Sequence, residues 1–144
     1  MDAGKIIIGF LLMIGMLCMS GCVNEGTTTK KTFENIDFES EIVEIANAYI
    51  DYNREEMYDD SGDMYYNTRS IEVKYLLHNP AERAVTVQVV VYLYDEFGME
   101  LYSEGPYVIS LPAGYTESGA NTISYAGTDV ATFDHARIVA IEQQ

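Results

Sequence analysis

The 144-residue chain is predicted to be an all-β protein, an antiparallel β-sandwich of about seven strands. Apolar residues recur at every second position in several runs, which is the pattern of strands with one buried face. Turn residues separate these runs at intervals of about 8–12 residues, as in sandwich domains. The regular alternation of strands with helices that would indicate a parallel α/β sheet is absent. We expect the sandwich to occupy residues 40–144.

The clearest strand pattern lies between residues 85 and 94. Every second side chain from Val85 to Leu93 is apolar, which predicts one face packed in the core. The other face becomes apolar toward its end, and its last residues are the interface candidates of the domain: Val90, Tyr92 and Tyr94. We expect the second sheet, or the segment around Tyr49, to cover this patch.

The remaining strands are read from shorter patterns. Residues 71–77 alternate up to Asn79-Pro80, where proline cannot donate a ladder hydrogen bond. Further strands are expected in four segments: 99–102, 107–111, around 123, and 136–141. Residues 42–52 fit a helical stripe as well as a strand, and their Ile, Val and Tyr content favours a strand.

Two acidic segments are predicted to connect strands. Residues 95–98 form a tight turn in which Gly98 is free to adopt positive φ. Residues 54–67 are predicted to be an acidic loop with a turn at Ser61-Gly62.

The first 22 residues have the pattern of an export signal. Lys5 precedes an apolar run from Ile6 to about Met19, which has the length of a signal-peptide core. The following Met19-Ser20-Gly21-Cys22 resembles the lipobox of bacterial and archaeal lipoproteins. This resemblance implies a signal peptide at residues 1–21 and lipidation of Cys22. The alternative is an uncleaved anchor helix over residues 6–23, which would tether the same domain to the same membrane.

Cysteine usage agrees with a lipid anchor. The two cysteines are Cys18 and Cys22, so the mature chain keeps one and forms no internal disulfide. Residues 22–39 are predicted to comprise the lipidated cysteine and a flexible linker, because Thr, Asn, Gly and Lys dominate there. The expected location is the extracytoplasmic face of the cell membrane.

The charge excludes one class of partner. The chain carries 23 acidic against 8 basic residues and a formal net charge of −15. Such a surface repels phosphate backbones, so no nucleic-acid binding is expected. The expected partners are the membrane, reached through the lipid, and a protein of the cell envelope.

Several short motifs resemble the FxLYD-type Ig-like domains of prokaryotic surface lipoproteins. The segment Val91-Tyr92-Leu93-Tyr94-Asp95 resembles the naming motif, with Val91 in place of Phe, and Gly98 matches the glycine of its corner. His78-Asn79 and the loop at residues 111–114 resemble further family positions, and the likeness extends from Ser70 to Glu142. It implies an Ig-like sandwich that acts as a binding or packing module and not as an enzyme.

Catalytic and zinc-binding patterns are weak. After Cys22 the sequence contains no further cysteine, and no Gly-x-Ser-x-Gly motif occurs. His78 and His135 are the two imidazoles, and their separation does not match a zinc motif. We expect His78 at a strand end and His135 at the entry of the last strand, where Asp134 could orient it. No catalytic residue and no cofactor are expected.

Calcium is the alternative cofactor. Carboxylates surround a glycine turn at Asp59, Asp60 and Asp63, and oxygen donors of this kind suit a hard cation. The stretch lacks the complete EF-hand loop, and an acidic solvated loop is the favoured interpretation. The alternative function is a calcium-dependent carbohydrate-binding or hydrolytic surface protein, with the nearby tyrosines contacting sugar: Tyr58, Tyr65 and Tyr66.

The sequence thus predicts a membrane-anchored lipoprotein whose Ig-like domain is a non-catalytic binding or scaffold module. A third possibility is a subunit of a larger envelope complex that adds an edge strand to a neighbour.

Overall fold

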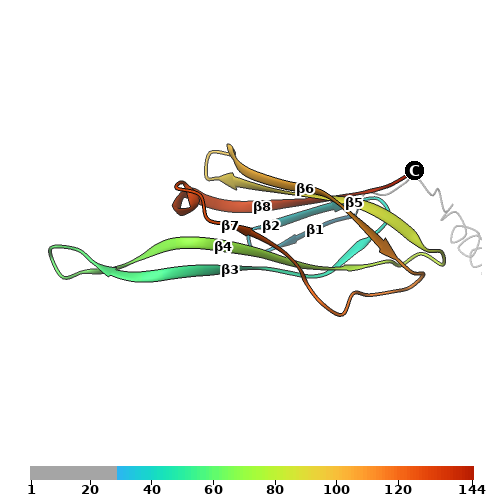
Figure 1. Ribbon diagram of the computed structural model, residues 1–144, viewed down its shortest axis with the longest axis horizontal. Coiled ribbons are helices and arrows are strands. Elements are labelled where there is room, and N and C mark those ends of the chain that lie inside the picture. The colour runs from blue at the N-terminus through green and yellow to red at the C-terminus, as the bar shows by residue number, and fades with distance from the viewer. Residues whose placement is uncertain (1–28) are drawn as a thin grey trace, which may run out of the picture.

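The computed structural model describes residues 29–144 and contains eight strands and one 3-10 helix. The elements are β1 (Thr29–Phe33), β2 (Ile36–Ser40), β3 (Glu44–Tyr58), β4 (Met64–His78), β5 (Val85–Asp95), β6 (Glu100–Leu111), β7 (Asn121–Tyr125), η1 (Val130–Thr132) and β8 (Phe133–Glu142). One sheet has the strand order β1-β2-β8-β5-β6 and the other β3-β4-β7. Figure 1 shows the two layers.

The predicted all-β sandwich is confirmed. Most neighbouring strands are antiparallel, and the exception is the pair β2–β8, which is parallel from Ile36↔Ala136 to Ser40↔Ala140. The expected signal or anchor helix and Cys22 lie outside the described residues. Within the part of the chain that the structure describes, no helix is long and apolar enough to cross a membrane.

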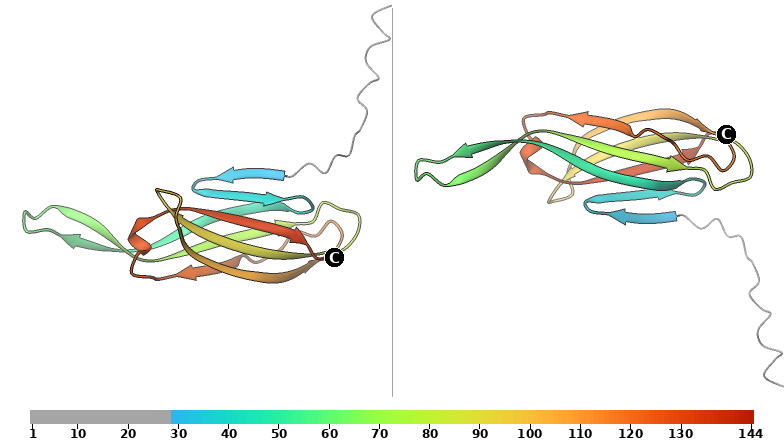
Figure 2. Two further views of the ribbon diagram at one scale, coloured as in Figure 1. Left: turned by 90° about the horizontal axis from the view of Figure 1, so that it is seen from above. Right: turned by 90° about the horizontal axis from the view of Figure 1, so that it is seen from below.

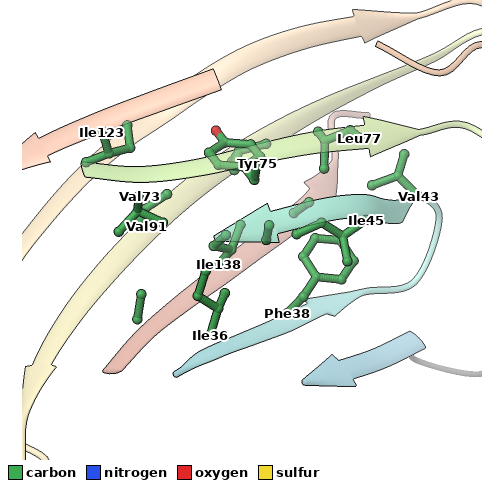
Figure 3. Close-up of a cluster of buried hydrophobic side chains, with 14 of the residues drawn as sticks. Ile36, Phe38, Val43, Ile45, Val73, Tyr75, Leu77, Val91, Ile123 and Ile138 are labelled. Atoms are coloured by element: carbon green, nitrogen blue, oxygen red, sulfur yellow. The ribbon is translucent and has the colours of Figure 1, made fainter. Parts of the chain in front are cut away.

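The core lies between the two sheets and follows the predicted alternation. In β5 every second residue from Val85 to Asp95 is buried, as is every second residue of β4 from Ile71 to Leu77. Figure 3 shows side chains of both sheets meeting there, with Tyr75 and Val73 from β4 opposite Val91 and Ile138. Burial of these side chains supplies the main stabilising free energy of the fold.

The predicted linker at residues 22–39 is wrong for its second part. Residues 36–40 form β2, whose Ile36 and Phe38 are 1% and 2% exposed. Residues 29–33 form β1, which pairs antiparallel with β2. The sandwich therefore includes residues 29–39 and does not start at residue 40. The sequence does not reveal β2 because only Ile36, Phe38 and Ser40 alternate inward. The strand that β2 pairs with, β8, lies near the far end of the sequence.

The segment at residues 42–52 is a strand from Glu44 onward, so the favoured interpretation is confirmed. The predicted acidic loop at residues 54–67 is wrong, because β3 continues to Tyr58 and β4 begins at Met64. Only residues 59–63 form the connecting turn. Figures 1 and 2 show the resulting hairpin extending well beyond every other strand.

A bulge shapes the edge strand β6. The register with β5 shifts between Val89 and Val91, opposite Gly105. Gly105 has φ +118°, and a Cβ atom there would lie 2.5 Å from the backbone oxygen of Val89. This position needs glycine, both for its conformation and for the close approach of β5.

Candidate functional site

The part of the molecule that stands apart from the core is the tip of the β3–β4 ribbon. We call residues 53–69 the projecting hairpin. Its strands pair from Arg54↔Thr68 to Tyr58↔Met64, after a register shift between Asn53 and Arg54. The third strand, β7, pairs with β4 only from Ile71 to Tyr75, so no described strand flanks the projecting hairpin. Both of its backbone edges are therefore open to solvent.

The turn at the tip is built by one carboxylate. Asp59 Oδ1 accepts the backbone N–H groups of Ser61, at 2.8 Å, and of Asp63, at 2.9 Å. The Gly62 N–H donates to the Asp59 carbonyl at 3.0 Å, and Gly62 adopts φ +84°. An aspartate that caps its own turn in this way lets the chain reverse within a few residues.

One contact across the two strands and one within β3 support the ribbon between the turn and the rest of the described domain, which we call the body. Arg69 forms an exposed ion pair with Glu55, and the Arg54 guanidinium lies 4.2 Å from the ring centroid of Tyr52. An isolated two-stranded ribbon is marginally stable in water, so these contacts and the continuous strands hold the projecting hairpin in place.

The projecting hairpin exposes large apolar side chains. Directly opposite residues share a face, so Tyr58, Met64 and Tyr66 lie on one face with Glu56, whereas Tyr65 lies on the other. Tyr58 is 66% exposed and Tyr66 is 56% exposed, and Met64 and Tyr65 are both 48% exposed. Large exposed side chains of this kind, gathered on an element without a core, are typical of contact surfaces.

The calcium alternative receives no support from the geometry. Asp59 uses its carboxylate for the turn, as described above. Across residues 29–144, no group of three His, Cys, Asp or Glu side chains is placed to hold a metal ion. Asp59, Asp60 and Asp63 are therefore neighbours in sequence that the turn does not gather around one point.

The interface candidates Val90, Tyr92 and Tyr94 lie on the outer face of the five-stranded sheet. The expectation that the second sheet or the segment around Tyr49 covers them is wrong, because the second sheet packs on the opposite face of β5. They are half-buried. Tyr94 stacks on Tyr92 and on His135, with centroid distances of 6.3 and 5.1 Å. These rings cover one another and leave a smaller apolar surface than the sequence suggests.

The two histidines occupy structural positions on different sheets. His78, the last residue of β4, has its Nδ1 2.7 Å from the Thr116 hydroxyl oxygen. His135 Nδ1 lies 2.9 Å from Asp134 Oδ2, so the expected neighbour is present. The structure does not bring the two imidazoles together.

A tyrosine cluster that the sequence does not predict connects the edge strands β6 and β7 of the two sheets. Tyr102 stacks on Tyr125 across the two sheets at 4.8 Å, and the hydroxyl groups of Tyr102 and Tyr107 both donate to the Glu104 carboxylate. The hydrogen bond to Glu104 raises the pKa of both tyrosines. Tyr102, Glu104 and Tyr107 all lie on β6, whereas the stacking partner Tyr125 lies on the other sheet, and no local motif signals that contact.

Two more tyrosines have a raised pKa, namely Tyr125 of this cluster and Tyr75 of the core. The Tyr125 hydroxyl donates to Asp129, which raises the pKa of Tyr125 to about 12. Burial raises the pKa of Tyr75, with smaller contributions from Glu117 and Glu104. The neutral form of all four tyrosines is therefore favoured, and Tyr102, Tyr107 and Tyr125 donate their hydroxyl groups to carboxylates.

Comparisons with known proteins do not place this chain in a family. No family model matches the sequence, and no curated protein matches it. Among solved structures, Campylobacter jejuni cj0090 is 12% identical, with a TM-score of 0.42 over 77% of this chain and 100% of its own. A DUF1425 family member from Shewanella sp. PV-4 is 8% identical, with a TM-score of 0.41 over 83% and 93%. At these values neither structure carries an argument about this chain.

Proposed function

We propose that the protein is a lipid-anchored, non-catalytic contact module on the extracytoplasmic face of the membrane. In this proposal the sandwich is a rigid support and the projecting hairpin is the element that touches a partner. The observation that carries the proposal is the exposure of Tyr58, Met64, Tyr65 and Tyr66 on a ribbon that extends beyond the core. The proposed anchor rests on the sequence pattern around Cys22.

The topology is well suited to this arrangement. Thr29 pairs with Ser40, which pairs with Ala140, so β1 starts at the end of the sandwich that also holds the C-terminus. β3 starts at this end, and its 15 residues lead to the tip of the projecting hairpin at the other end. At about 3.3 Å per residue the strand spans roughly 50 Å. Figure 2 shows the C-terminus and the tip at opposite ends.

A lipidated Cys22 would place these two ends at different distances from the bilayer. Seven positions separate Cys22 from Thr29, and at most about 3.5 Å per residue this is roughly 25 Å of chain. The β1 end of the sandwich would then stay near the membrane. The projecting hairpin would be the part of the domain that can reach furthest from the lipid surface.

The open edges of the projecting hairpin also suit the envelope-complex possibility. A strand of a neighbour can pair with the backbone of residues 53–58 or 64–69, while tyrosines on the two faces contact its side chains. This mode of contact needs no catalytic group and no cofactor.

Two measurements test the proposal. Mass spectrometry of the native protein is expected to show a chain that starts at Cys22 and carries a diacylglyceryl group, and this mass is lost in Cys22→Ser. A photo-crosslinking residue at position 65, in native membranes, is expected to link the protein to a defined neighbour, whereas one at Thr122 on β7 is not. An unmodified chain with an intact leader, or equal crosslinking from both positions, would contradict the proposal.

A further inference from the structure

We propose that the projecting hairpin binds a protein surface that presents Lys or Arg side chains beside apolar groups. This inference rests on the proposed function and assigns the chemistry of its partner. It excludes a second copy of this chain and an anionic lipid surface as the occupant.

The charge of the projecting hairpin gives the first argument. Residues 53–69 contain five carboxylates and two arginines. One arginine, Arg69, is already paired with Glu55, and the other, Arg54, lies over Tyr52. Within residues 29–144, no basic side chain forms an ion pair with Glu56, Asp60 or Asp63. The tip therefore presents unneutralised negative charge beside its tyrosines.

Nearer the core, the same β3–β4 ribbon also has carboxylates beside a tyrosine, and there a lysine of this chain contacts both. Lys74 Nζ lies 5.8 Å from the ring centroid of Tyr49, and it bonds Asp51 at 2.5 Å and Glu72 at 3.0 Å. A tyrosine and a carboxylate two residues apart on β3 thus share one cation from the neighbouring strand. Hydrogen bonds to the two carboxylates raise the pKa of Lys74.

The projecting hairpin has a carboxylate and a tyrosine at the same spacing on β3, in the reverse order and without the cation. Glu56 and Tyr58 are also two residues apart on β3, and they lie opposite Tyr66 and Met64 on β4. Met64 stands opposite the tyrosine, where Lys74 stands opposite Tyr49 in the body. A cation from a partner could therefore contact Glu56 together with a tyrosine ring face, which is favourable for Lys and more so for Arg.

Like-charge repulsion disfavours the other occupants. Two projecting hairpins would bring together two acidic tips of this composition, and an anionic lipid surface would meet the same repulsion. The apolar side chains of Tyr58, Met64 and Tyr66 provide contact area, and the carboxylates select among partners.

The experiment uses the full chain in detergent and three peptides with the same Phe and Leu content. The first peptide carries Lys, the second Gln and the third Glu at the same positions, and binding is followed by NMR at the projecting hairpin. The Lys peptide is expected to bind at least about tenfold more tightly than the Gln peptide, with affinity that falls as salt rises. The Glu peptide is expected to bind more weakly than both.

Two variants with the same change of charge test whether the Lys peptide binds at the projecting hairpin. Glu56→Gln is expected to reduce the affinity for the Lys peptide several-fold, whereas Glu41→Gln, an exposed site outside the hairpin with the same change of charge, leaves it unchanged. Equal affinity for the Lys and Gln peptides, no binding of the Lys peptide at low salt, or self-association through residues 53–69 would overturn the inference. Crosslinking from position 65 tests the contact function separately, and it can succeed when the charge preference fails.

Discussion

Two corners of this molecule have the same hydrogen bonds and opposite surroundings. In Asp59–Asp63 and in Asp95–Met99, an aspartate side chain accepts two backbone N–H groups and a glycine with positive φ closes the turn. The donor–acceptor distances agree, at 2.8 and 2.9 Å in both corners. Asp95 is 5% exposed at the end of the sandwich, whereas Asp59 is exposed at the tip of the projecting hairpin.

The two corners show that the same turn geometry can contribute differently to the stability of the domain. The pattern Asp-x-x-Gly specifies the corner wherever it occurs. Burial decides whether the corner contributes to the cooperative stability of the domain or only to the order of one ribbon. We therefore expect the body to hold the fold and the projecting hairpin to be an appended contact element.

The largest expected effect concerns the body. Replacement Phe38→Ala removes a 2% exposed ring from β2 and should lower the free energy of unfolding by about 3–5 kcal/mol. Tyr58→Ala, a large-to-small change on the projecting hairpin, should change it by less than about 0.5 kcal/mol. Urea unfolding measures both. A small effect of Phe38→Ala would return β2 to the status of a linker.

The two corners are compared directly by removing their aspartates. Asp95→Ala leaves two partly buried N–H groups without their acceptor and should cost about 2–3 kcal/mol of unfolding free energy. Asp59→Ala should leave the global value within about 0.5 kcal/mol and instead speed amide exchange at Ser61 and Asp63. Equal global losses at the two corners would contradict the separation of body and hairpin.

The corner glycines provide a finer test, because both sites are open. A Cβ at Gly62 or Gly98 would meet no atom within 4 Å, so alanine adds only the strain of positive φ. This strain is about 1–2 kcal/mol. The strain should lower the denaturant midpoint in Gly98→Ala. In Gly62→Ala it should only speed amide exchange near the turn. A midpoint shift of the same size in both variants would show that the projecting hairpin unfolds together with the body.

The smallest expected effect is on the unfolding free energy at alkaline pH, and it concerns Tyr125 in the body. The pKa of Tyr125 is raised to about 12, whereas an unfolded tyrosine ionises near pH 10. The neutral form is favoured in the folded state, so this contribution is complete below about pH 10 and is lost as the pH rises to about 12. Tyr125→Phe should make the decline of unfolding free energy over this range shallower, and Thr128→Ala should not. An unchanged slope in Tyr125→Phe would contradict the assigned hydrogen bond.

Much of the body could be predicted from the sequence, because its strands are specified by their own alternation. Residues 71–77 and 85–93 show the period of two that burial requires. The short strand β2 was missed because its inward side chains are few and its parallel partner β8 is distant in the sequence. The projecting hairpin was predicted as a loop because its acidic residues obscured strands that continue from the body.

The contact surface was only partly predictable. In the alternative function, the sequence predicts sugar contacts beside a calcium loop at Tyr58, Tyr65 and Tyr66. The structure places them on a ribbon whose turn carboxylate, Asp59, already accepts two backbone N–H groups. The stacking of Tyr102 on Tyr125 joins the two sheets, and such a contact is not visible in a local pattern. The hydrogen bond from Tyr102 to Glu104, in contrast, lies within β6.

The most direct test of the central claim removes the projecting hairpin. Residues 54–68 are replaced by a copy of the Asp95–Gly98 corner, and the free energy of unfolding is measured in urea beside that of the unaltered chain. We predict a difference of no more than about 1 kcal/mol, since the replaced residues contribute little to the buried core. A loss of more than about 3 kcal/mol, or a chain that no longer unfolds cooperatively, would contradict the account.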